Sequence, residues 1–347
     1  MTHVTTVAVI GCGWAGVRHA QAFRSCGAEV TWSVDVLGAR ATALSAELGN
    51  ASRVSTDYRE ALADQWLDAV DICLPHNLHA EVAVAAAAAG KHILCEKPIA
   101  AALDEADAMI AAAETAGVVL MIAENERFSP LTARIRALLD ASAIGRPALL
   151  QMTRECYLES SFMQDRPWFL NARAAAGGMM MSGGVHDFET ARMLLGDVAS
   201  VYALRAPQRF VEMEGDDTSA VMFRFTSEAV GVDVLSYVMK SLTTAAGSEV
   251  HSIRIDGTLG SIRSDDGRTI HLYSEKPELQ IGERLVEHVI HVPEQDTFLL
   301  EANHFLASIR FGTEPVTSGR AQRRPLEIVL AAYRSMETGL PVAIPPA

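Results

Sequence analysis

The side chains best suited to chemistry lie in short polar stretches within the first 190 residues. Gly11-Cys12-Gly13-Trp14-Ala15-Gly16 is a glycine-rich turn, and Asp35 follows Gly16 by 19 residues. Glu96-Lys97-Pro98 supplies a lysine, and Gly184-Val185-His186 supplies a histidine. A lysine amine can take part in proton transfer when burial and a neighbouring cation lower its pKa, and an imidazole, whose ordinary pKa lies near neutrality, can accept and return a proton.

The glycine-rich turn has the G-x-G-x-x-G spacing of a dinucleotide-binding turn. Gly11 permits the tight turn, Gly13 lets a pyrophosphate approach the backbone, and Gly16 lets the next helix pack on the strand. The apolar run 4–10 predicts a strand and 17–26 predicts a helix, which is the context that this motif requires. The N–H groups at the start of that helix would face the phosphates. A turn that serves geometry alone is the less favoured interpretation.

Asp35 lies near the end of the second predicted strand, 29–36. A carboxylate there can accept hydrogen bonds from the adenosine ribose diol and would repel a 2′-phosphate, which favours NAD over NADP. Arg40 is close enough in sequence to leave NADP open, and a solvent-exposed helix charge is the alternative interpretation of Arg40.

The elements that must position these residues alternate between strand and helix over the first third of the chain. Further strands are predicted at 53–54, 69–74, 92–95 and 118–123, and helices at 41–48, 58–63, 78–89 and 103–116. This alternation predicts a doubly wound parallel sheet of the Rossmann type, whose ligands bind at the carboxyl ends of the strands. Pro75 to His79, Glu96 to Pro98 and Asn125 to Arg127 all follow predicted strands.

The pattern changes after residue 126. Helices are predicted at 131–139, 185–195, 298–311 and 325–338, and strands at 147–156, 201–205, 218–225, 229–237, 252–256, 261–263, 269–273 and 286–291. The sequence therefore predicts a dinucleotide-binding domain over 1–126 and a second domain over 127–347, built on a large, mainly antiparallel open sheet. A sheet face without helices favours pairing with other copies, so we expect a homodimer or a homotetramer.

Composition narrows the class of protein. The 347 residues carry a formal net charge of −14, which argues against nucleic acid as a partner. The sequence contains no apolar run of the roughly 20 residues that span a bilayer, and its first ten residues do not predict a signal peptide. The five cysteines form no Cys-x-x-Cys pair, which favours reduced thiols in a cytoplasm and predicts no metal site.

Together these residues resemble the Gfo/Idh/MocA family of oxidoreductases. The resemblance rests on the glycine-rich turn, Asp35, Asn77-Leu78-His79, 89–98 ending in Glu96-Lys97-Pro98, Asn125-x-Arg127-Phe128-x-Pro130, Gly177-Gly178 and Gly184-x-His186. It implies NAD(P)-dependent hydride transfer at a carbinol carbon of a sugar, a cyclitol or a related polyol. Lys97 matches the family's catalytic lysine, and His186 matches its catalytic histidine, the candidate general base for the substrate hydroxyl.

The resemblance and the residue types also suggest which side chains contact ligands. For the substrate, Arg127 matches a position at the mouth of the site, Ser182 can bind a hydroxyl, and Tyr157 and Trp168 could stack on a sugar ring. A domain-bridging salt bridge for Arg127, and core packing for both aromatic residues, are equal alternatives. Loops near 157–175 would set specificity. The expected cofactor contacts are Gly11, Cys12, Gly13, Trp14, Ala15, Gly16, Asp35, Arg40, Pro75, Asn77, His79, Glu96, Lys97 and Asn125.

The sequence departs from the family pattern around His186. The common form has an aspartate four residues before the histidine and another three residues after it, whereas this chain has Ser182 and Glu189. A serine hydroxyl can bind a sugar or the imidazole but supplies no negative charge. We expect an altered substrate preference or pH optimum rather than loss of redox function.

Two other functions stay open. One is a glycosidase that retains its NAD and acts by transient oxidation of C3. The other is a non-catalytic NAD-binding sensor, against which the presence of both Lys97 and His186 argues.

Overall fold

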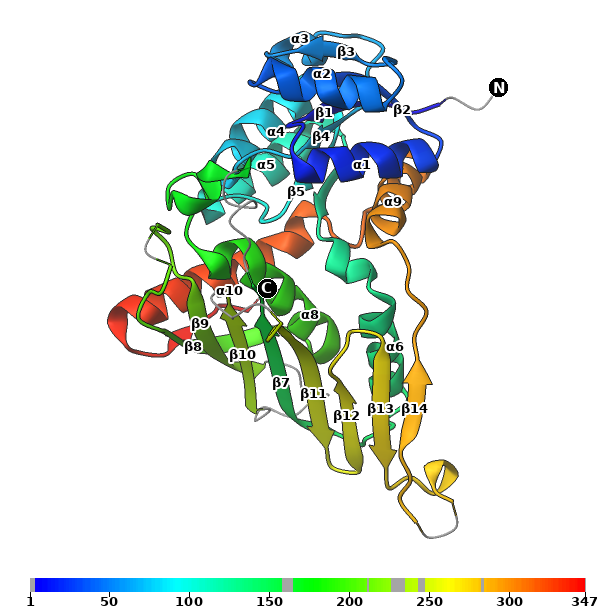
Figure 1. Cartoon of the computed structure of the whole chain (residues 1–347), viewed down its shortest axis with the longest axis vertical. Coiled ribbons are helices and arrows are strands. Elements are labelled where there is room, and N and C mark those ends of the chain that lie inside the picture. The colour runs from blue at the N-terminus through cyan, green and yellow to red at the C-terminus, as the bar shows by residue number, and fades with distance from the viewer. Residues whose placement is uncertain are drawn as a thin grey trace. The chain divides into compact units, whose positions relative to one another are not determined.

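The structure is a computed structural model that describes residues 4–157, 165–210, 212–225, 235–242, 247–281 and 284–346 (Figure 1). The chain forms two compact units, the first made of Met1–Asn125 with Asp296–Arg323 and the second of Glu126–Gln295 with Arg324–Ala347. The first boundary thus falls one residue before the predicted one. The second domain is not the uninterrupted segment 127–347 of the sequence prediction, because 296–323 belongs to the first unit.

The first unit contains the predicted parallel sheet, in the order β3-β2-β1-β4-β5-β6. Every neighbouring pair of its strands runs parallel, so the predicted doubly wound fold is confirmed. Its elements are β1 (Thr6–Ile10), α1 (Trp14–Ser25), β2 (Glu29–Val34), α2 (Gly38–Glu47), β3 (Arg53–Ser55), α3 (Tyr58–Leu62), β4 (Ala69–Ile72), α4 (His79–Ala88), β5 (His92–Glu96), α5 (Leu103–Ala116), β6 (Leu120–Ala123) and α9 (Thr297–Phe311).

Burial explains the strands of this sheet and locates its ligand edge. All residues of β4 and β6 are buried, as expected for strands covered by helices on both faces. The strand order reverses between β1 and β4. In open parallel sheets, ligands bind at such a reversal, outside the carboxyl ends of the strands.

Helix α9 belongs to the first unit because its apolar face packs on α1. The rings of Phe23 and Phe305 meet edge to face with centroids 6.2 Å apart, and the Cys26 thiol donates to the carbonyl of Leu299. Farther along, Arg320 and Arg323 form ion pairs with acidic residues of α5. These contacts join residues more than 200 positions apart, which periodicity cannot reveal.

The second unit is built on a nine-stranded sheet in the order β14-β13-β12-β11-β7-β10-β9-β8-β15. Strands β7 and β10 run parallel and the other neighbours antiparallel, which confirms the predicted sheet type. The elements are α6 (Pro130–Asp140), β7 (Pro147–Glu155), a π-helical turn (Met180–Gly184), α8 (Val185–Leu195), β8 (Val198–Arg205), β9 (Thr218–Phe225), β10 (Leu235–Ser241), β11 (Val250–Gly257), β12 (Gly260–Ser264), β13 (Thr269–Ser274), β14 (His288–His291) and β15 (Val342–Ala343), with α10 (Gly319–Thr338) shared between the units.

One face of this sheet is covered and the other is open. Helices α6 and α8 lie against one face (Figure 1). On the opposite face, the side chains of Leu204, Met222, Tyr273 and Val289 are 55, 45, 41 and 47% exposed. Residues 229–234 of the predicted strand 229–237 lie outside the described residues, and β10 begins at Leu235. Among the described helices, none is long and apolar enough to cross a membrane.

Candidate functional site

The glycine-rich turn has a different steric constraint at each glycine. Gly11 has φ +99°, and a Cβ there would lie 2.2 Å from the carbonyl oxygen of Cys73. A Cβ at Gly16 would lie 2.0 Å from the carbonyl oxygen of Gly11, whereas a Cβ at Gly13 would meet nothing within 4 Å. No side chain caps the start of α1. The backbone is therefore open at Gly13 and its neighbouring N–H groups, which fits the pyrophosphate of a dinucleotide.

Asp35, which directly follows β2, holds this turn in place through two hydrogen bonds. Its Oδ2 accepts the N–H of Cys12 (2.9 Å) and its Oδ1 accepts the N–H of Leu37 (2.8 Å), with only 8% of the residue exposed. The side chain of Cys12 is buried and its thiol donates to the carbonyl of Val34, so Cys12 does not present its side chain to a ligand. Arg40 lies half-buried on α2.

Trp14 stands out at the start of α1 because it is 52% exposed. The guanidinium of Arg18 lies 4.4 Å from the centroid of the indole ring. Phe298 of α9 meets the same indole edge to face at 5.9 Å. Ala15, which follows Trp14, is half-buried. The glycine turn is thus flanked by an exposed aromatic side chain that is fixed by a cation and a second ring.

Of the residues that follow β4, His79 does not present its ring to a ligand. Pro75 is half-buried and Asn77 is exposed, but His79 is fully buried. Its Nδ1 and Nε2 lie 2.9 Å from the carbonyl oxygens of Pro98 and Leu74, and burial lowers its pKa. The ring of His79 therefore lies between the turn after β4 and the turn after β5 instead of facing a ligand, which corrects the predicted contact of this side chain with a cofactor.

The turn after β5 presents Lys97. The Lys97–Pro98 peptide is cis, and the Lys97 side chain is partly exposed. Glu96 Oε2 accepts the backbone N–H of Lys97 (3.0 Å), so Glu96 fixes the backbone that carries the lysine. Asn125, after β6, donates from Nδ2 to Thr297 Oγ1 (2.8 Å).

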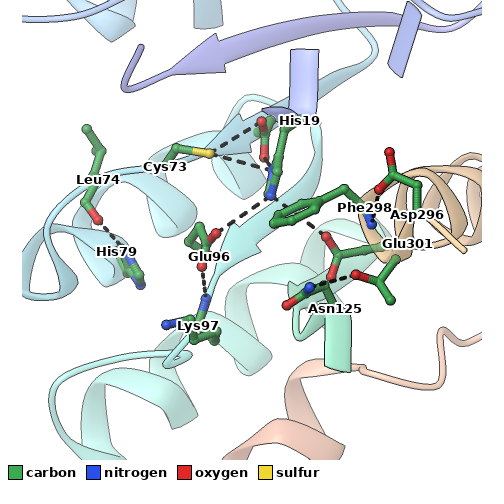
Figure 2. Close-up of polar contacts among 12 residues, drawn as sticks. His19, Cys73, Leu74, His79, Glu96, Lys97, Asn125, Asp296, Phe298 and Glu301 are labelled. Carbon is green, nitrogen blue, oxygen red and sulfur yellow. Dashed lines mark hydrogen bonds and ion pairs between the residues drawn. The ribbon is translucent and has the colours of Figure 1, made fainter. Parts of the chain in front are cut away.

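A buried cluster of ionisable residues, which sequence reasoning missed, lies behind this turn (Figure 2). His19 of α1 lies among Asp71, Glu96 and Glu301, which come from β4, β5 and α9. The signal that could have indicated it is Asp71 itself, since an acid inside a fully buried strand needs a polar partner. Donor atoms of His19, Asp71 and Cys73 lie within 4.8 Å of one another, a grouping that cysteine spacing did not predict.

In the second unit, His186 is the second residue of α8 and differs from its neighbours in burial. Residues 181–190 are all buried except His186, which is partly exposed, so a ligand can reach this stretch at the histidine. The π-helical turn Met180–Gly184 precedes it directly, and such turns are frequent at functional sites. Ser182 lies in this turn, and 5% of it is exposed.

Tyr333 and Asp216 hold the segment that leads to His186. The Tyr333 hydroxyl accepts the N–H groups of Gly178 (2.8 Å) and Met181 (3.1 Å) and donates to Asp216 Oδ1 (2.7 Å). Asp216 Oδ2 also accepts the N–H of Met180. A Cβ at Gly177 would lie 2.6 Å from the Tyr333 hydroxyl oxygen, and a Cβ at Gly178 would lie 2.2 Å from the backbone nitrogen of Asp216, which explains both adjacent glycines that the sequence singled out.

Arg127 and Glu189 lie together in the second unit. Arg127 is half-buried, with Nη1 3.6 Å from Glu189 Oε1, and Glu189 Oε2 accepts from Arg192 (2.8 Å). This ion pair lies within one unit, so it is not the domain-bridging salt bridge of the alternative interpretation. Glu189, at the family's second aspartate position, is ion-paired to two arginines.

Arg154 is a functional candidate that sequence reasoning missed. Its Nη1 donates to Glu126 Oε1 (2.9 Å), and its Nε lies 3.3 Å from Asp187 Oδ1. These residues and His251 form the charged side of a pocket of about 50 Å³ that apolar side chains also line. Burial raises the pKa of Glu126, but the charges of Arg154 and His186 outweigh it and lower that pKa to about 2. A charged residue thus lies near His186 although Ser182 carries no charge.

The two aromatic candidates differ. Tyr157 is 46% exposed. Trp168 packs against the buried cluster of Phe169, Met179, Met213 and Leu242, which favours the core interpretation. Residues 158–164 of the predicted specificity loop lie outside the described residues.

Two family models match the chain. A model described as an oxidoreductase family with an NAD-binding Rossmann fold matches residues 5–124. A model of the GFO/IDH/MocA C-terminal domain matches residues 132–263. The two models fall on the two sheets described above.

Relatives of known name match over nearly the full chain. A scyllo-inositol 2-dehydrogenase (NAD(+)) of Bacillus subtilis is 30% identical over 355 residues, covering 99% of this chain and 97% of the relative. A myo-inositol 2-dehydrogenase of Thermotoga maritima is 28% identical over 340 residues, covering 95% and 96%.

Solved structures share the fold. An oxidoreductase from Agrobacterium radiobacter, in complex with NAD+, L-tartaric acid and magnesium, has a TM-score of 0.85 at 25% identity, covering 98% of both chains. A levoglucosan dehydrogenase in complex with NADH and levoglucosan has a TM-score of 0.86 at 23% identity, covering 99% of this chain and 100% of its own.

Proposed function

Because the chain belongs to the Gfo/Idh/MocA family of oxidoreductases, we propose that it transfers a hydride between NAD and a secondary carbinol or ketone carbon of a sugar, a cyclitol or a related polyol. The observation that carries this proposal is that one unit holds both the open backbone at Gly13 and the Glu96-Lys97-Pro98 turn. Both lie at the carboxyl ends of strands of one parallel sheet, where this fold binds its ligands.

Lys97 and His186 have different roles toward the substrate hydroxyl group. Bound NAD would supply the hydride acceptor. The Lys97 ammonium binds the substrate oxygen and stabilises the negative charge that develops there as the proton leaves. His186 accepts that proton and returns it when the reaction runs as a reduction. Its partial exposure in an otherwise buried stretch supports this assignment.

Glu126 supports His186 in the absence of the usual aspartate. Ser182 cannot supply a charge, but Glu126 is close enough for the charge of His186 to act on its pKa. Arg154 holds the Glu126 carboxylate in place. We assign to Glu126 part of the electrostatic role that aspartate has in relatives with the common pattern, and to Ser182 a hydrogen bond to a substrate hydroxyl.

NAD is the expected cofactor rather than NADP. The Asp35 carboxylate is fixed beside the glycine turn by two backbone N–H groups, and it keeps negative charge where a 2′-phosphate would lie. A cytoplasmic enzyme fits both this cofactor and the five free thiols.

A screen of inositols, pyranosides and sugar acids tests the proposed function. We expect at least one class to reduce NAD+ faster than NADP+, measured by NADH absorbance, and His186→Asn to lower kcat by about 10²- to 10⁴-fold. His288→Asn, on β14, serves as the control and should leave kcat unchanged.

The outcomes separate the candidate functions. Release of a glycoside leaving group without net NADH would instead identify a glycosidase that retains its NAD. Binding of NADH with no turnover of any compound would favour a sensor.

We further propose that the chain forms a homodimer or a homotetramer through the open face of the nine-stranded sheet. Leu204, Met222, Tyr273 and Val289 give that face apolar area on four strands. Light scattering at micromolar concentration should give the mass of two or four chains, and Met222→Glu should reduce it. Trp66→Glu, at an exposed apolar residue of the first unit, is the matched control. A monomeric mass for the unsubstituted protein would contradict this proposal.

A further inference from the structure

His19 is a buried base surrounded by acids. Only 2% of it is exposed, and its Nδ1–H donates to Asp71 Oδ1 (2.9 Å). On its other side, Nε2 lies 3.6 Å from Glu96 Oε1 and 3.8 Å from Glu301 Oε1. Figure 2 shows the imidazole at the centre of these side chains, with the ring of Phe298 beside it.

The surroundings keep His19 protonated. Burial lowers the pKa of the imidazole, but the charges of Asp71, Glu301 and Glu96 outweigh this and raise it to about 10. Burial raises the pKa of Glu301; the charge of His19 lowers it, but the nearby charges of Glu96, Glu124 and Asp71 raise it further, so that pKa lies well above its usual range. The Cys73 thiol, which donates to Asp71 Oδ2, is kept neutral in the same way. The cluster then contains one imidazolium facing the carboxylates of Asp71 and Glu96.

Glu96 links this cluster to the lysine. Its Oε1 faces the His19 imidazolium, while its Oε2 accepts the backbone N–H of Lys97 (3.0 Å). The next residue is held from the other side, because His79 lies 2.9 Å from the carbonyl oxygen of Pro98. The turn that presents Lys97 is therefore contacted at Glu96 and at Pro98. The orientation of the Glu96 side chain, which accepts the backbone N–H of Lys97, depends on the positive charge of His19.

We propose that His19 is a positioning residue for Lys97, because its protonated imidazole fixes the Glu96 carboxylate in the orientation that binds the backbone N–H of Lys97. The inference rests on the proposed function of Lys97 and adds a residue to that site. A neutral amide at position 19 could still bond Asp71, but it would leave the partly buried Glu96 carboxylate without its counter-charge.

A metal ion is the competing explanation for His19, Asp71 and Cys73, whose donor atoms lie within 4.8 Å of one another. The contacts favour the imidazolium, since Nδ1 donates its proton to Asp71 and a protonated nitrogen has no lone pair for a metal. Metal content is therefore one of the measurements that decide the proposal.

Amide hydrogen exchange at Lys97 tests the proposal without reference to activity. We expect His19→Gln to increase the exchange rate of the Lys97 N–H at least tenfold, because its acceptor is no longer fixed. His304→Gln is the matched control, since His304 lies in the same unit on α9, where it accepts the N–H of Val316. An unchanged Lys97 exchange rate in folded His19→Gln would overturn the proposal. So would zinc bound stoichiometrically to the unsubstituted protein and lost from His19→Gln.

Kinetics give a second readout that a role in packing would not produce. His19→Gln should lower kcat by about 10- to 100-fold, as expected for a small misplacement of a reacting group, with KM for NAD+ and Kd for NADH within about twofold of the unsubstituted values. His19→Gln/Glu96→Gln should be no slower than Glu96→Gln alone, whereas multiplicative losses would contradict the coupling.

Stability against pH covers the case in which His19→Gln does not fold. The folded pKa of His19 lies above its unfolded value, so its contribution is fully present below about pH 6.5 and is lost as the pH rises toward about 10. In Glu96→Gln, the pKa of His19 in the folded protein should be lower than in the unsubstituted protein. The stability that is lost as the pH rises should therefore be smaller, and the loss should end at lower pH. An unchanged loss would overturn the proposal. If the unsubstituted protein oxidises no polyol, the proposed function fails, while amide exchange still decides the role of His19.

Discussion

Replacing Lys97 with methionine should lower kcat by about 10²- to 10⁴-fold, while the Kd for NADH stays within a few-fold of the unsubstituted value. The ammonium group interacts with a charge that develops only as the alcohol loses its proton, so its removal affects the transition state more than the bound ground state. Methionine keeps the length and the apolar stem of the side chain. Steady-state kinetics with the best substrate of the screen, together with NADH fluorescence titration, measure the two quantities.

Two further variants sharpen this prediction. Lys97→Arg keeps the charge but changes the shape of the donor, so it should recover only part of the rate. Lys276→Met is the matched control, since Lys276 lies near the surface of the second unit, where its Nζ donates to the carbonyl of Ala141. A Lys97→Met protein that is folded and has the unsubstituted kcat would refute the catalytic assignment.

Alanine substitutions at Gly13 and Gly11 should separate cofactor binding from folding. At Gly13, φ is −80° and a Cβ would meet nothing within 4 Å, so Gly13→Ala should leave the Tm nearly unchanged. The added methyl group would occupy the space through which a pyrophosphate approaches, and we expect the Kd for NADH to rise tenfold or more.

Gly11→Ala should instead destabilise the fold. Its φ of +99° alone costs an alanine about 1–3 kcal/mol, and its Cβ would lie 2.2 Å from the carbonyl oxygen of Cys73. Thermal unfolding and NADH titration of both variants make the comparison. Normal NADH affinity in Gly13→Ala, or an unchanged Tm in Gly11→Ala, would contradict this account of the turn.

Helices with local end signals could be predicted to the residue. The sequence predicts helices over 103–116 and 185–195, and the structure has Leu103–Ala116 and Val185–Leu195. Each is followed by a glycine with positive φ, Gly117 and Gly196, which ends the helix whatever packs around it. Strand starts were predicted less closely. The predicted starts at residues 201 and 286 differ by three and two residues from those of β8 and β14, because pairing with neighbouring strands decides where a strand begins.

Domain membership required the tertiary structure. Periodicity identified a helix at 298–311 but not the unit to which it belongs. That depends on the contacts of Phe305 and Leu299 with α1, across more than 270 residues of chain. The sequence prediction accordingly placed α9 in the second domain.

The glycine turn, Lys97 and His186 could be singled out from sequence alone, because short spacings fix a turn, a strand end or a helix start through local backbone geometry. The residues that contact them are known from the folded chain and not from its sequence. His19 and Asp71 are 52 positions apart and Arg154 and Glu126 are 28 apart, yet each pair is in direct contact. His79, which matched a cofactor-binding turn in sequence, is fully buried between two backbone carbonyl groups. The physical reason is that burial and charge pairing depend on which elements pack together, and local spacing carries no record of that packing.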